Sequence, residues 1–156
     1  MFRTIISPKE LYEKLGRQTW VIIDCRYNLG HPDSGAEAYR KAHIPGASYA
    51  HLDKDLSGKI EPGKTGRHPL PSIVKMTQRF SSWGISDGIQ VVVYDDRSGA
   101  VAARLWWMLR SLGHDRVAVL DGGWRAWTEG GYPVEVAIVG SGPRVFKPRP
   151  RNDWTV

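Results

Sequence analysis

The chain has 156 residues, of which 41% are hydrophobic and 24% charged, as is typical of one soluble globular domain or slightly more. No apolar run approaches the roughly 18 residues that cross a bilayer, and the charged N-terminus is unlike a secretory signal, so we expect a cytoplasmic protein with no membrane partner. The net charge of +6 is spread along the chain without a basic stripe or a nucleic-acid-binding motif, so we expect no nucleic-acid partner.

The chain has a single cysteine, Cys25, which excludes an internal disulfide and a cysteine-built zinc site. No two histidines have the spacing that would place two metal ligands on one helix face. The histidines are His31, His43, His51, His68 and His114. The sequence therefore predicts no metal and no cofactor.

The first elements have clear boundaries. Ser7 and Glu10 form a capping-box pattern around Pro8, and Gly16 ends the predicted helix. Residues 20–23 are a continuous apolar run, as expected of a strand buried on both faces, and the strand ends at residues 24–26.

Residues 27–69 are rich in glycine, proline, histidine and charge, with one helical patch at residues 36–41. A stretch so irregular inside a compact domain indicates functional or interface loops. Residues 71–83 then predict a helix that Gly84 ends. Its apolar side is predicted to carry Ile73, Val74, Thr77 and Phe80.

The second half alternates strands and helices. Residues 90–94 and 117–120 predict buried strands, and residues 99–112 predict the strongest helix, whose spacing gives one core-facing stripe. That stripe is Val101, Leu105, Met108, Leu109 and Leu112. Asp121 is predicted to cap a short helix that begins at residues 122–123. This alternation favours an α/β fold with a parallel sheet and helices on both faces.

After Pro133 the pattern decays, and residues 140–151 hold glycines, prolines and basic residues. We interpret residues 1–140 as one domain and residues 141–156 as a linker toward a further domain. The basic residues of this segment are predicted to form a solvated tail, and they are Arg144, Lys147, Arg149 and Arg151.

Two strand ends carry polar residues where parallel sheets bind ligands. The first end holds Asp24, Cys25 and Arg26, and the second leads directly into the strong helix. The second end forms a candidate anion loop, because its backbone N–H groups and the helix N-terminus make a partial positive pole. This loop is Asp95, Asp96, Arg97, Ser98 and Gly99.

Several motifs resemble the rhodanese family. Ala42-His43-Ile44-Pro45-Gly46-Ala47 is similar to the family's H-I-P-G-A signature, and Asp24-Cys25-Arg26 to its D-x-R strand end. The segments Tyr94-Asp95, Ala102 to Trp107, Leu109-Arg110, Gly113-His114 and Val119 to Trp124 resemble the first domain of tandem thiosulfate and 3-mercaptopyruvate sulfurtransferases. The resemblance runs from about Ile6 to Trp154.

The resemblance implies a rhodanese fold with a central parallel sheet of about five strands. It also implies an active enzyme that carries sulfane sulfur on a cysteine persulfide in its second domain, because a thiolate can accept such sulfur. Asp95 stands at the position of that cysteine, and a carboxylate cannot carry a persulfide. The expected partners are a second rhodanese domain of the same polypeptide and a small anionic sulfur donor.

The function that follows is transfer of sulfane sulfur from thiosulfate or 3-mercaptopyruvate to a thiol or cyanide, with this chain inactive alone. The sequence does not choose between the two donors. A second hypothesis is a stand-alone, non-catalytic module that keeps the anion-binding loop and recognises a partner.

Asp95 and Cys25 each have other interpretations. Asp95 with Asp96 resembles a magnesium-dependent phosphate acceptor site, although Arg97 replaces the second acid of the common pattern, and an acid at a helix start also acts as a simple cap. Cys25 is either an alternative nucleophile or, as we expect, a buried structural residue.

The remaining site predictions concern loops and interfaces. Asp24 and Arg26 are expected to fix loops through hydrogen bonds, and His43 to hold the turn at residues 44–46. Arg67, His68 and Trp107 are candidate cleft or interdomain residues, the first two because they lie in a loop where a cation can meet an anion.

Overall fold

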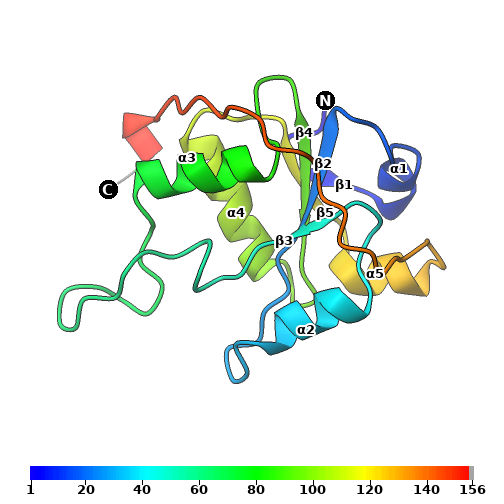
Figure 1. Cartoon of the computed structure of the whole chain (residues 1–156), viewed down its shortest axis with the longest axis horizontal. Coiled ribbons are helices and arrows are strands. Elements are labelled where there is room, and N and C mark those ends of the chain that lie inside the picture. The colour runs from blue at the N-terminus through cyan, green and yellow to red at the C-terminus, as the bar shows by residue number, and fades with distance from the viewer. Residues whose placement is uncertain (155–156) are drawn as a thin grey trace.

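The structure, a computed structural model, describes residues 1–154. One sheet of five parallel strands in the order β1-β5-β4-β2-β3 crosses the molecule (Figure 1). The strands are β1 (Ile5–Ile6), β2 (Trp20–Asp24), β3 (Ser48–Tyr49), β4 (Gln90–Tyr94) and β5 (Val117–Leu120). The predicted parallel α/β sheet is confirmed. The two short edge strands, β1 and β3, are too brief for an apolar pattern to reveal.

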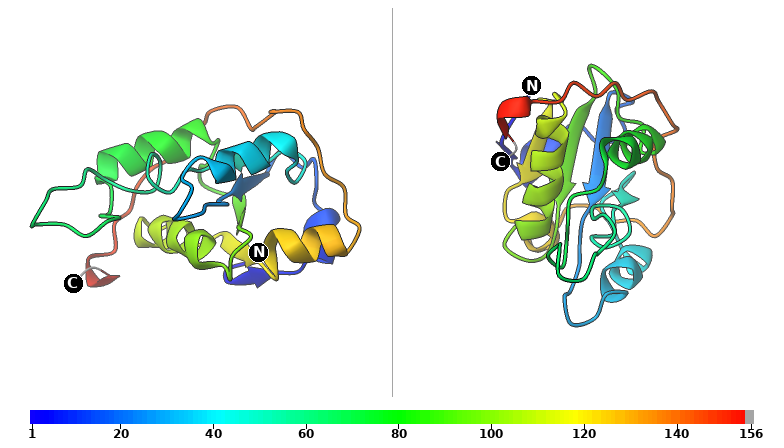
Figure 2. Two further views of the ribbon diagram at one scale, coloured as in Figure 1. Left: turned by 90° about the horizontal axis from the view of Figure 1, so that it is seen from below. Right: turned by 90° about the vertical axis from the view of Figure 1, so that its left-hand side faces the viewer.

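Helices cover both faces of this sheet, as predicted. The helices are α1 (Pro8–Tyr12), α2 (Ser34–Lys41), α3 (Ile73–Ser82), α4 (Ala100–Ser111), α5 (Gly123–Glu129) and the 3-10 turn η1 (Asn152–Trp154). Helices α3 and α4 lie on one side, whereas α1, α2 and α5 lie on the other (Figure 2, left). Within residues 1–154, no helix is long and apolar enough to cross a membrane.

Local sequence signals predicted the starts of two helices, one correctly and one incorrectly. The capping box at Ser7 is confirmed, since its hydroxyl accepts from the Glu10 N–H and the Glu10 carboxylate accepts from the Ser7 N–H. The predicted cap by Asp121 is wrong. Gly122 is the N-cap of α5, at a φ of 72° that favours glycine, and Asp121 is exposed.

The two central strands have aligned ends. In the pairing of β2 with β4, Asp24 lies opposite Tyr94, so the residues that follow them, Cys25 and Asp95, leave the sheet side by side. The Cys25 N–H continues the ladder by donating to the Tyr94 carbonyl over 2.7 Å. The sheet register thus places the chain's only thiol next to the predicted anion loop.

The core has one cluster on each side of the sheet. Successive residues of β2 and β4 contribute alternately to the two clusters, as expected for strands buried on both faces. The predicted stripe of α4 is confirmed in the cluster on the α3 side. The predicted apolar side of α3 is right for Phe80, which is buried, but wrong for Ile73 and Val74, which are 44% and 66% exposed, and it missed the buried Met76. The Met76–Phe80 pair, one helical turn apart, faces the core instead.

The interpretation of the basic C-terminal residues as a solvated tail is right only in that Lys147 and Arg149 are exposed, because the segment itself packs on the domain. Phe146 is buried against Phe80 with ring centroids 5.1 Å apart, and the chain on both sides of it is hydrogen-bonded to the domain. Arg144 donates to the carbonyls of Gly84 and Gln18, while Arg149 and Arg151 pair with Asp87 and Asp115. Thr155 and Val156, the end of the predicted linker, lie outside the described residues. The boundary at residue 140 and the domain beyond it stay predictions.

Candidate functional site

The loop after β4 encloses the carboxylate of Asp95. One oxygen, Oδ1, accepts the N–H groups of Arg97 and Gly99 at 2.9 and 3.0 Å, and Oδ2 accepts those of Val101 and Ala102 at 3.1 and 2.9 Å. The side chain is nearly buried, since the residue is 3% exposed. The inward N–H groups of this loop thus hold an anion that belongs to the chain itself, and binding of an outside anion by the loop stays a prediction.

Left-handed backbone conformations give this loop its shape. Ser98 and Gly99 have φ values of 45° and 83°, which turn successive N–H groups toward one point before α4 begins. On the other side, the Trp124 N–H donates to the Asp95 carbonyl at 2.9 Å. A side chain at Gly123 would collide with that same carbonyl oxygen, so the Gly122-Gly123 turn fits closely against the loop.

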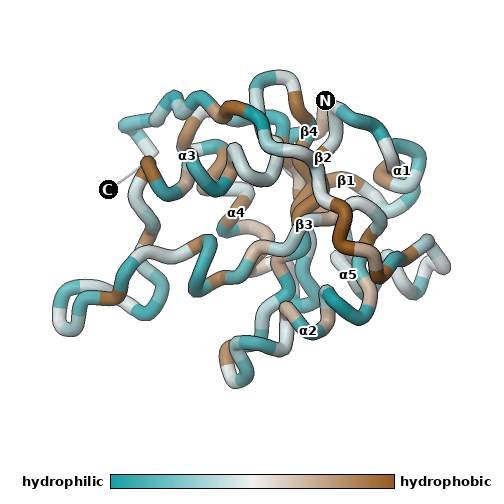
Figure 3. Tube along the Cα trace, viewed as in Figure 1, coloured by the Kyte–Doolittle hydropathy of each residue, from teal (hydrophilic) through white to brown (hydrophobic). Residues whose placement is uncertain are grey.

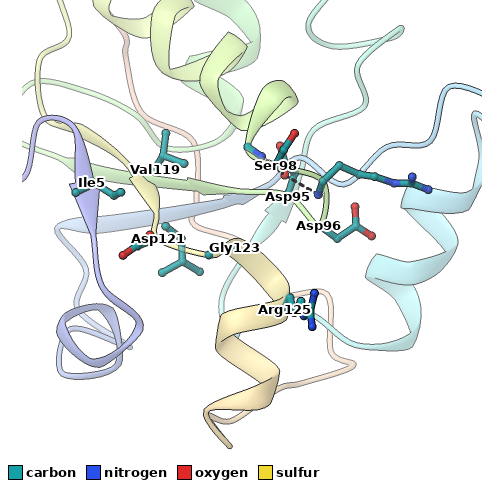
Figure 4. A pocket seen from close by; sticks show the side chains of 12 residues that line it. Ile5, Asp95, Asp96, Ser98, Val119, Asp121, Gly123 and Arg125 are labelled. Atoms are coloured by element: carbon teal, nitrogen blue, oxygen red, sulfur yellow. Dashed lines mark hydrogen bonds between the residues drawn. The ribbon is translucent and has the colours of Figure 1, made fainter.

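A pocket of about 390 Å³ lies between this loop and the start of α5 (Figure 4). Its apolar wall comes from Ile5 and Val119, and its charged rim includes Asp96, Asp121 and Arg125 (Figure 4). Arg125 is exposed and paired with Glu129 at 2.8 Å, so Arg97 is the one cation of this lining without an ion pair among residues 1–154.

The end of β2 is a hydrogen-bonded network rather than an open site. Asp24 is fully buried and accepts from the backbone and guanidinium of Arg26 and from the Tyr94 hydroxyl, the last at 2.7 Å. Arg26 also donates to the Ala42 carbonyl and lies 4.1 Å from the Trp124 ring centroid. Burial opposes the charge of Arg26, but the hydrogen bond and charge of Asp24 outweigh it and raise the pKa of the guanidinium. This network joins β2, β4, α5 and the loop after α2.

Cys25 lies between these charged groups, yet its own side chain is fully buried. Burial raises the pKa of the thiol well above its ordinary value, and the negative charges of Asp24, Asp95 and Asp55 raise it further. Among the described residues, its sulfur donates one long contact, 3.9 Å to the Ile23 carbonyl. Burial and the nearby carboxylates therefore both favour the neutral form of the thiol.

A second pocket, of about 420 Å³, opens on the α3 side of the same loop. Tyr27 and His68 form part of its wall, and Asp53 stands behind both of them. Asp53 accepts from the Tyr27 hydroxyl at 2.6 Å, and its other oxygen lies 3.2 Å from Nδ1 of His68 without the alignment of a hydrogen bond. Burial and the Asp53 contact raise the pKa of Tyr27 to about 12.

Neither ring nitrogen of His68 has a hydrogen-bond partner within the described chain, although both atoms are shielded from solvent. Nδ1 nevertheless faces the Asp53 carboxylate at 3.2 Å, and because both nitrogens are shielded from solvent, the ring presents no exposed polar atom to the pocket.

Two arginines complete the second pocket. Arg104 donates to the carbonyls of Leu56, His68 and Pro69, which ties the predicted cleft loop to α4, and burial lowers the pKa of its guanidinium. Arg97 is exposed and borders both pockets. The pocket therefore combines apolar walls with positive charge, as a small organic or inorganic anion requires.

The other predicted interface residues lie elsewhere. Arg67 is exposed and lines neither pocket, although its charge reaches Tyr27. Trp107 is half-buried beside Trp154, in a separate groove of about 220 Å³ that Leu70, Ile73 and Pro150 also line. His43 is fully buried and stacks on Tyr39, and its ring nitrogens lie 2.7 and 2.8 Å from the carbonyls of Tyr39 and Ala137.

Sequence reasoning missed Tyr27, Asp53 and Arg104. The first two lie in the irregular stretch, where no periodic pattern ranks one polar residue above another. Arg104 lies in the Ala102 to Trp107 segment that carries the family resemblance, but no role was predicted for it. The one available signal was its position one turn after Ala100, beside the loop.

The residues do not support the magnesium-dependent alternative. Across residues 1–154, no three side chains of histidine, cysteine, aspartate or glutamate gather into a metal-binding group. Asp95 is occupied by backbone donors and Asp24 by Arg26, so neither carboxylate is free to hold a cation.

The fold and the loop define a class of protein, the parallel α/β domains that hold a charged group at the carboxyl ends of their strands. Residues 7–130 match the family model described as Rhodanese-like domain, and the chain belongs to the rhodanese family. The family predicted from the motifs is confirmed.

Its relatives are sulfurtransferases. A Pseudomonas aeruginosa protein named "Probable 3-mercaptopyruvate sulfurtransferase" is 43% identical over 81% of this chain and 45% of its own length. The thiosulfate sulfurtransferase of Bos taurus is 34% identical over 94% of this chain and 50% of its own length. The chain thus spans about half the length of these relatives.

Solved structures agree. The 3-mercaptopyruvate sulfurtransferase from Leishmania major superposes with a TM-score of 0.77 at 36% identity, covering 97% of this chain and 40% of that one. Escherichia coli SseA, described with the 3-mercaptopyruvate sulfotransferases, gives a TM-score of 0.81 at 26% identity, covering 96% and 56%. The chain therefore corresponds to a single domain of such proteins.

Proposed function

We propose that this chain is the first, non-catalytic domain of a two-domain sulfurtransferase. The whole protein moves sulfane sulfur from thiosulfate or 3-mercaptopyruvate to a thiol or cyanide acceptor through a cysteine persulfide in a second rhodanese domain. The observation that carries this proposal is the Asp95 carboxylate, which fills the N–H ring of the loop at the position that the resemblance gives to the nucleophilic cysteine.

The chemistry of the two strand ends supports inactivity of the chain alone. A nucleophile for sulfane sulfur must be a thiolate that the substrate reaches. Asp95 cannot form a persulfide, and Cys25 is fully buried with a pKa raised by burial and by neighbouring carboxylates. The loop whose N–H groups surround an anion therefore carries no thiol, and the chain's one thiol, Cys25, lies outside that loop.

The pocket beside α4 supports a contribution to the cleft of the whole protein. Its two arginines, Arg97 and Arg104, suit a small sulfur-containing anion. Asp53 holds His68 from behind at 3.2 Å, so the imidazole has a fixed place on the wall. These groups are what this domain would present to a donor held against the second domain.

The second hypothesis, a stand-alone binding module, has less support. It requires the loop after β4 to bind an anion from outside, but all four inward N–H groups already bond to Asp95. What remains for such a module is the pocket at Tyr27 and His68.

A sulfurtransferase assay on the purified chain tests the proposal, with thiosulfate or 3-mercaptopyruvate as donor and cyanide as acceptor. We expect no turnover from the wild type or from Cys25→Ser. Turnover that disappears in Cys25→Ser would make Cys25 a persulfide carrier and overturn the assignment. Sequencing past codon 156 gives a second readout, since we expect the reading frame to continue into a rhodanese domain with a cysteine loop.

A further inference from the structure

The segment after α5 carries four exposed aliphatic side chains within six residues. We call residues 133–140 the strap. Four of its side chains, Val134, Val136, Ile138 and Val139, are 47%, 64%, 67% and 64% exposed. Figure 3 shows this apolar stretch in brown, where the strap crosses the front of the sheet edge near β3. Single exposed aliphatic residues are common, but a run of four on one segment indicates an interaction surface.

The strap is held firmly on its inner side. The backbone N–H and carbonyl of Glu135 both bond to His43 at 2.9 Å, forming an antiparallel bridge. The Glu135 side chain accepts the Gly46 N–H at 2.7 Å, and the Ala137 carbonyl lies 2.8 Å from Nε2 of His43. Glu135 is therefore fixed, and Val134, Val136 and Ile138, which alternate with residues 135 and 137, are exposed.

The outward backbone is open. Within residues 1–154, the N–H groups of Val136, Ile138 and Val139 donate no hydrogen bond to the protein. The strap lies outside the five-stranded sheet and is joined to the domain by a single bridge, but its β-branched residues with unpaired backbone groups still form a template for another strand. Strand addition uses such a template for its backbone bonds and takes specificity from alternate side chains.

The charges beside the strap indicate the kind of partner. Val139, Gly140 and Ser141 form one wall of a cleft of about 360 Å³, and the opposite wall includes Lys14, Arg17 and Trp20. No acidic residue lines this cleft, and neither cation has an ion-pair partner among the described residues. A second copy of the chain would bring a net charge of +6 to the same face and be repelled.

We infer that the strap and this cleft form a docking surface for an extended segment of another protein that alternates β-branched and acidic side chains, bound by strand addition. Its backbone would pair with the open N–H groups of the strap, and its carboxylates would meet Lys14 and Arg17. This surface consists of the strap and the cleft beside it. The inference does not depend on the proposed function.

The test is a titration of the isotope-labelled wild-type chain with an end-capped eight-residue peptide that alternates valine and glutamate. We expect saturable NMR shifts confined to the amides of the strap and to Trp20. A peptide with lysine in place of glutamate should not bind. A valine–glutamate peptide with every second backbone nitrogen methylated should bind at least tenfold more weakly, because it keeps the side chains but loses half of its N–H donors.

Variants identify the surface. Lys14→Glu combined with Arg17→Glu should weaken the acidic peptide at least tenfold and permit the lysine peptide to bind. Lys9→Glu, an exposed cation outside the cleft, and Val74→Asn, an exposed aliphatic residue on α3, are the matched controls and should leave binding unchanged.

Several outcomes would overturn the inference. They are an absence of saturable shifts at millimolar peptide, equal binding of the two peptides, and no effect of N-methylation. Sedimentation showing a dimer whose strap amides shift with concentration would assign the surface to a second copy. Association with vesicles of anionic phospholipid that the double charge reversal abolishes would assign it to a membrane.

Discussion

The two central strands end side by side, yet the residues that follow them have opposite surroundings. After β4, the Asp95 side chain turns into a ring of four backbone N–H groups that stabilises a negative charge. After β2, the Cys25 side chain turns into the core, where burial and three carboxylates oppose a negative charge. Although Cys25 and Asp95 lie next to each other in the sheet register, the surroundings of Asp95 favour a negative charge and those of Cys25 oppose one.

This difference shows that the position of a residue at a strand end does not determine its chemistry. A loop after a parallel strand offers donors only if left-handed residues turn its N–H groups inward, as Ser98 and Gly99 do here. The loop after β2 instead uses a salt bridge between Asp24 and Arg26 to satisfy its buried polar groups. The first arrangement suits a charged reactant, whereas the second fixes neighbouring loops.

Moving the thiol from one strand end to the other should have the largest effect. In Asp95→Cys on a Cys25→Ser background, we expect the introduced thiol to react with iodoacetamide about 100-fold faster at neutral pH than Cys25 does in the wild type, because N–H donors at a helix start lower a thiol pKa. Its pH profile should have a midpoint below the ordinary value of about 8.5. The rate is followed by mass spectrometry.

The same variant should take up sulfur from thiosulfate. The thiolate attacks the outer sulfur of thiosulfate, a new S–S bond forms, the S–S bond of thiosulfate breaks, and sulfite leaves with the electron pair. A mass gain of one sulfur atom reports this step. The matched control is Asp96→Cys, an exposed thiol next to the ring but outside it. Equal reactivity of the two introduced thiols would show that the N–H ring does not stabilise a thiolate.

Breaking the network after β2 should cause the next largest effect, on stability. Arg26→Ala leaves the buried Asp24 carboxylate without its counter-charge, which we expect to lower the free energy of unfolding by about 3–5 kcal/mol. Urea denaturation followed by tryptophan fluorescence measures it. Arg125→Ala removes an exposed pairing with Glu129 and should change stability little. A small loss in Arg26→Ala would mean that the network is not what fixes this strand end.

Removing the Asp95 carboxylate from the ring of N–H groups should lower the free energy of unfolding less than Arg26→Ala does. We expect Asp95→Ala to lower the free energy of unfolding by about 2 kcal/mol, as for the loss of a strong helix cap with buried donors left unpaired. Added sulfate or thiosulfate should restore part of this stability in the variant and have no such effect in the wild type, where the ring is filled. Asp96→Ala is the control, since its exposed side chain makes no hydrogen bond in the structure. A variant as stable as the wild type would refute the idea that Asp95 is an internal ligand.

Local patterns predicted much of the scaffold and part of the site. The capping box at Ser7, the buried strands and the stripe of α4 depend on residues within one or two turns of each other, and all are confirmed. The adjacency of the loops after β2 and β4 also follows from parallel pairing. The location of the anion loop could be predicted for that reason.

Contacts between distant segments could not be predicted in this way. Asp53 meets Tyr27 across 26 positions, and Arg104 meets the Pro69 carbonyl across 35. The basic C-terminal residues gain partners such as Asp87 and Asp115 only because the chain returns over the domain after α5. From composition alone, these residues are predicted to be solvated. The rotation of α3 likewise depends on what Met76 and Phe80 meet, including Phe146.

The smallest predicted effect is a pH dependence that isolates Cys25. Its pKa is raised in the folded chain, so above the ordinary thiol pKa of about 8.5 the unfolded state loses a proton that the folded state keeps. Stability from this group is therefore intact below pH 8.5 and falls as the pH rises, with a limiting slope of about 1.4 kcal/mol per pH unit. Between pH 7.5 and 9.5, the wild type should lose about 1 kcal/mol relative to Cys25→Ala, by urea denaturation at each pH. Cys25→Ser lacks the same ionisation and should behave like Cys25→Ala. A constant difference across this range, together with alkylation of the folded wild type at pH 8.5, would show that Cys25 ionises in place and that the two strand ends are less different than the structure indicates.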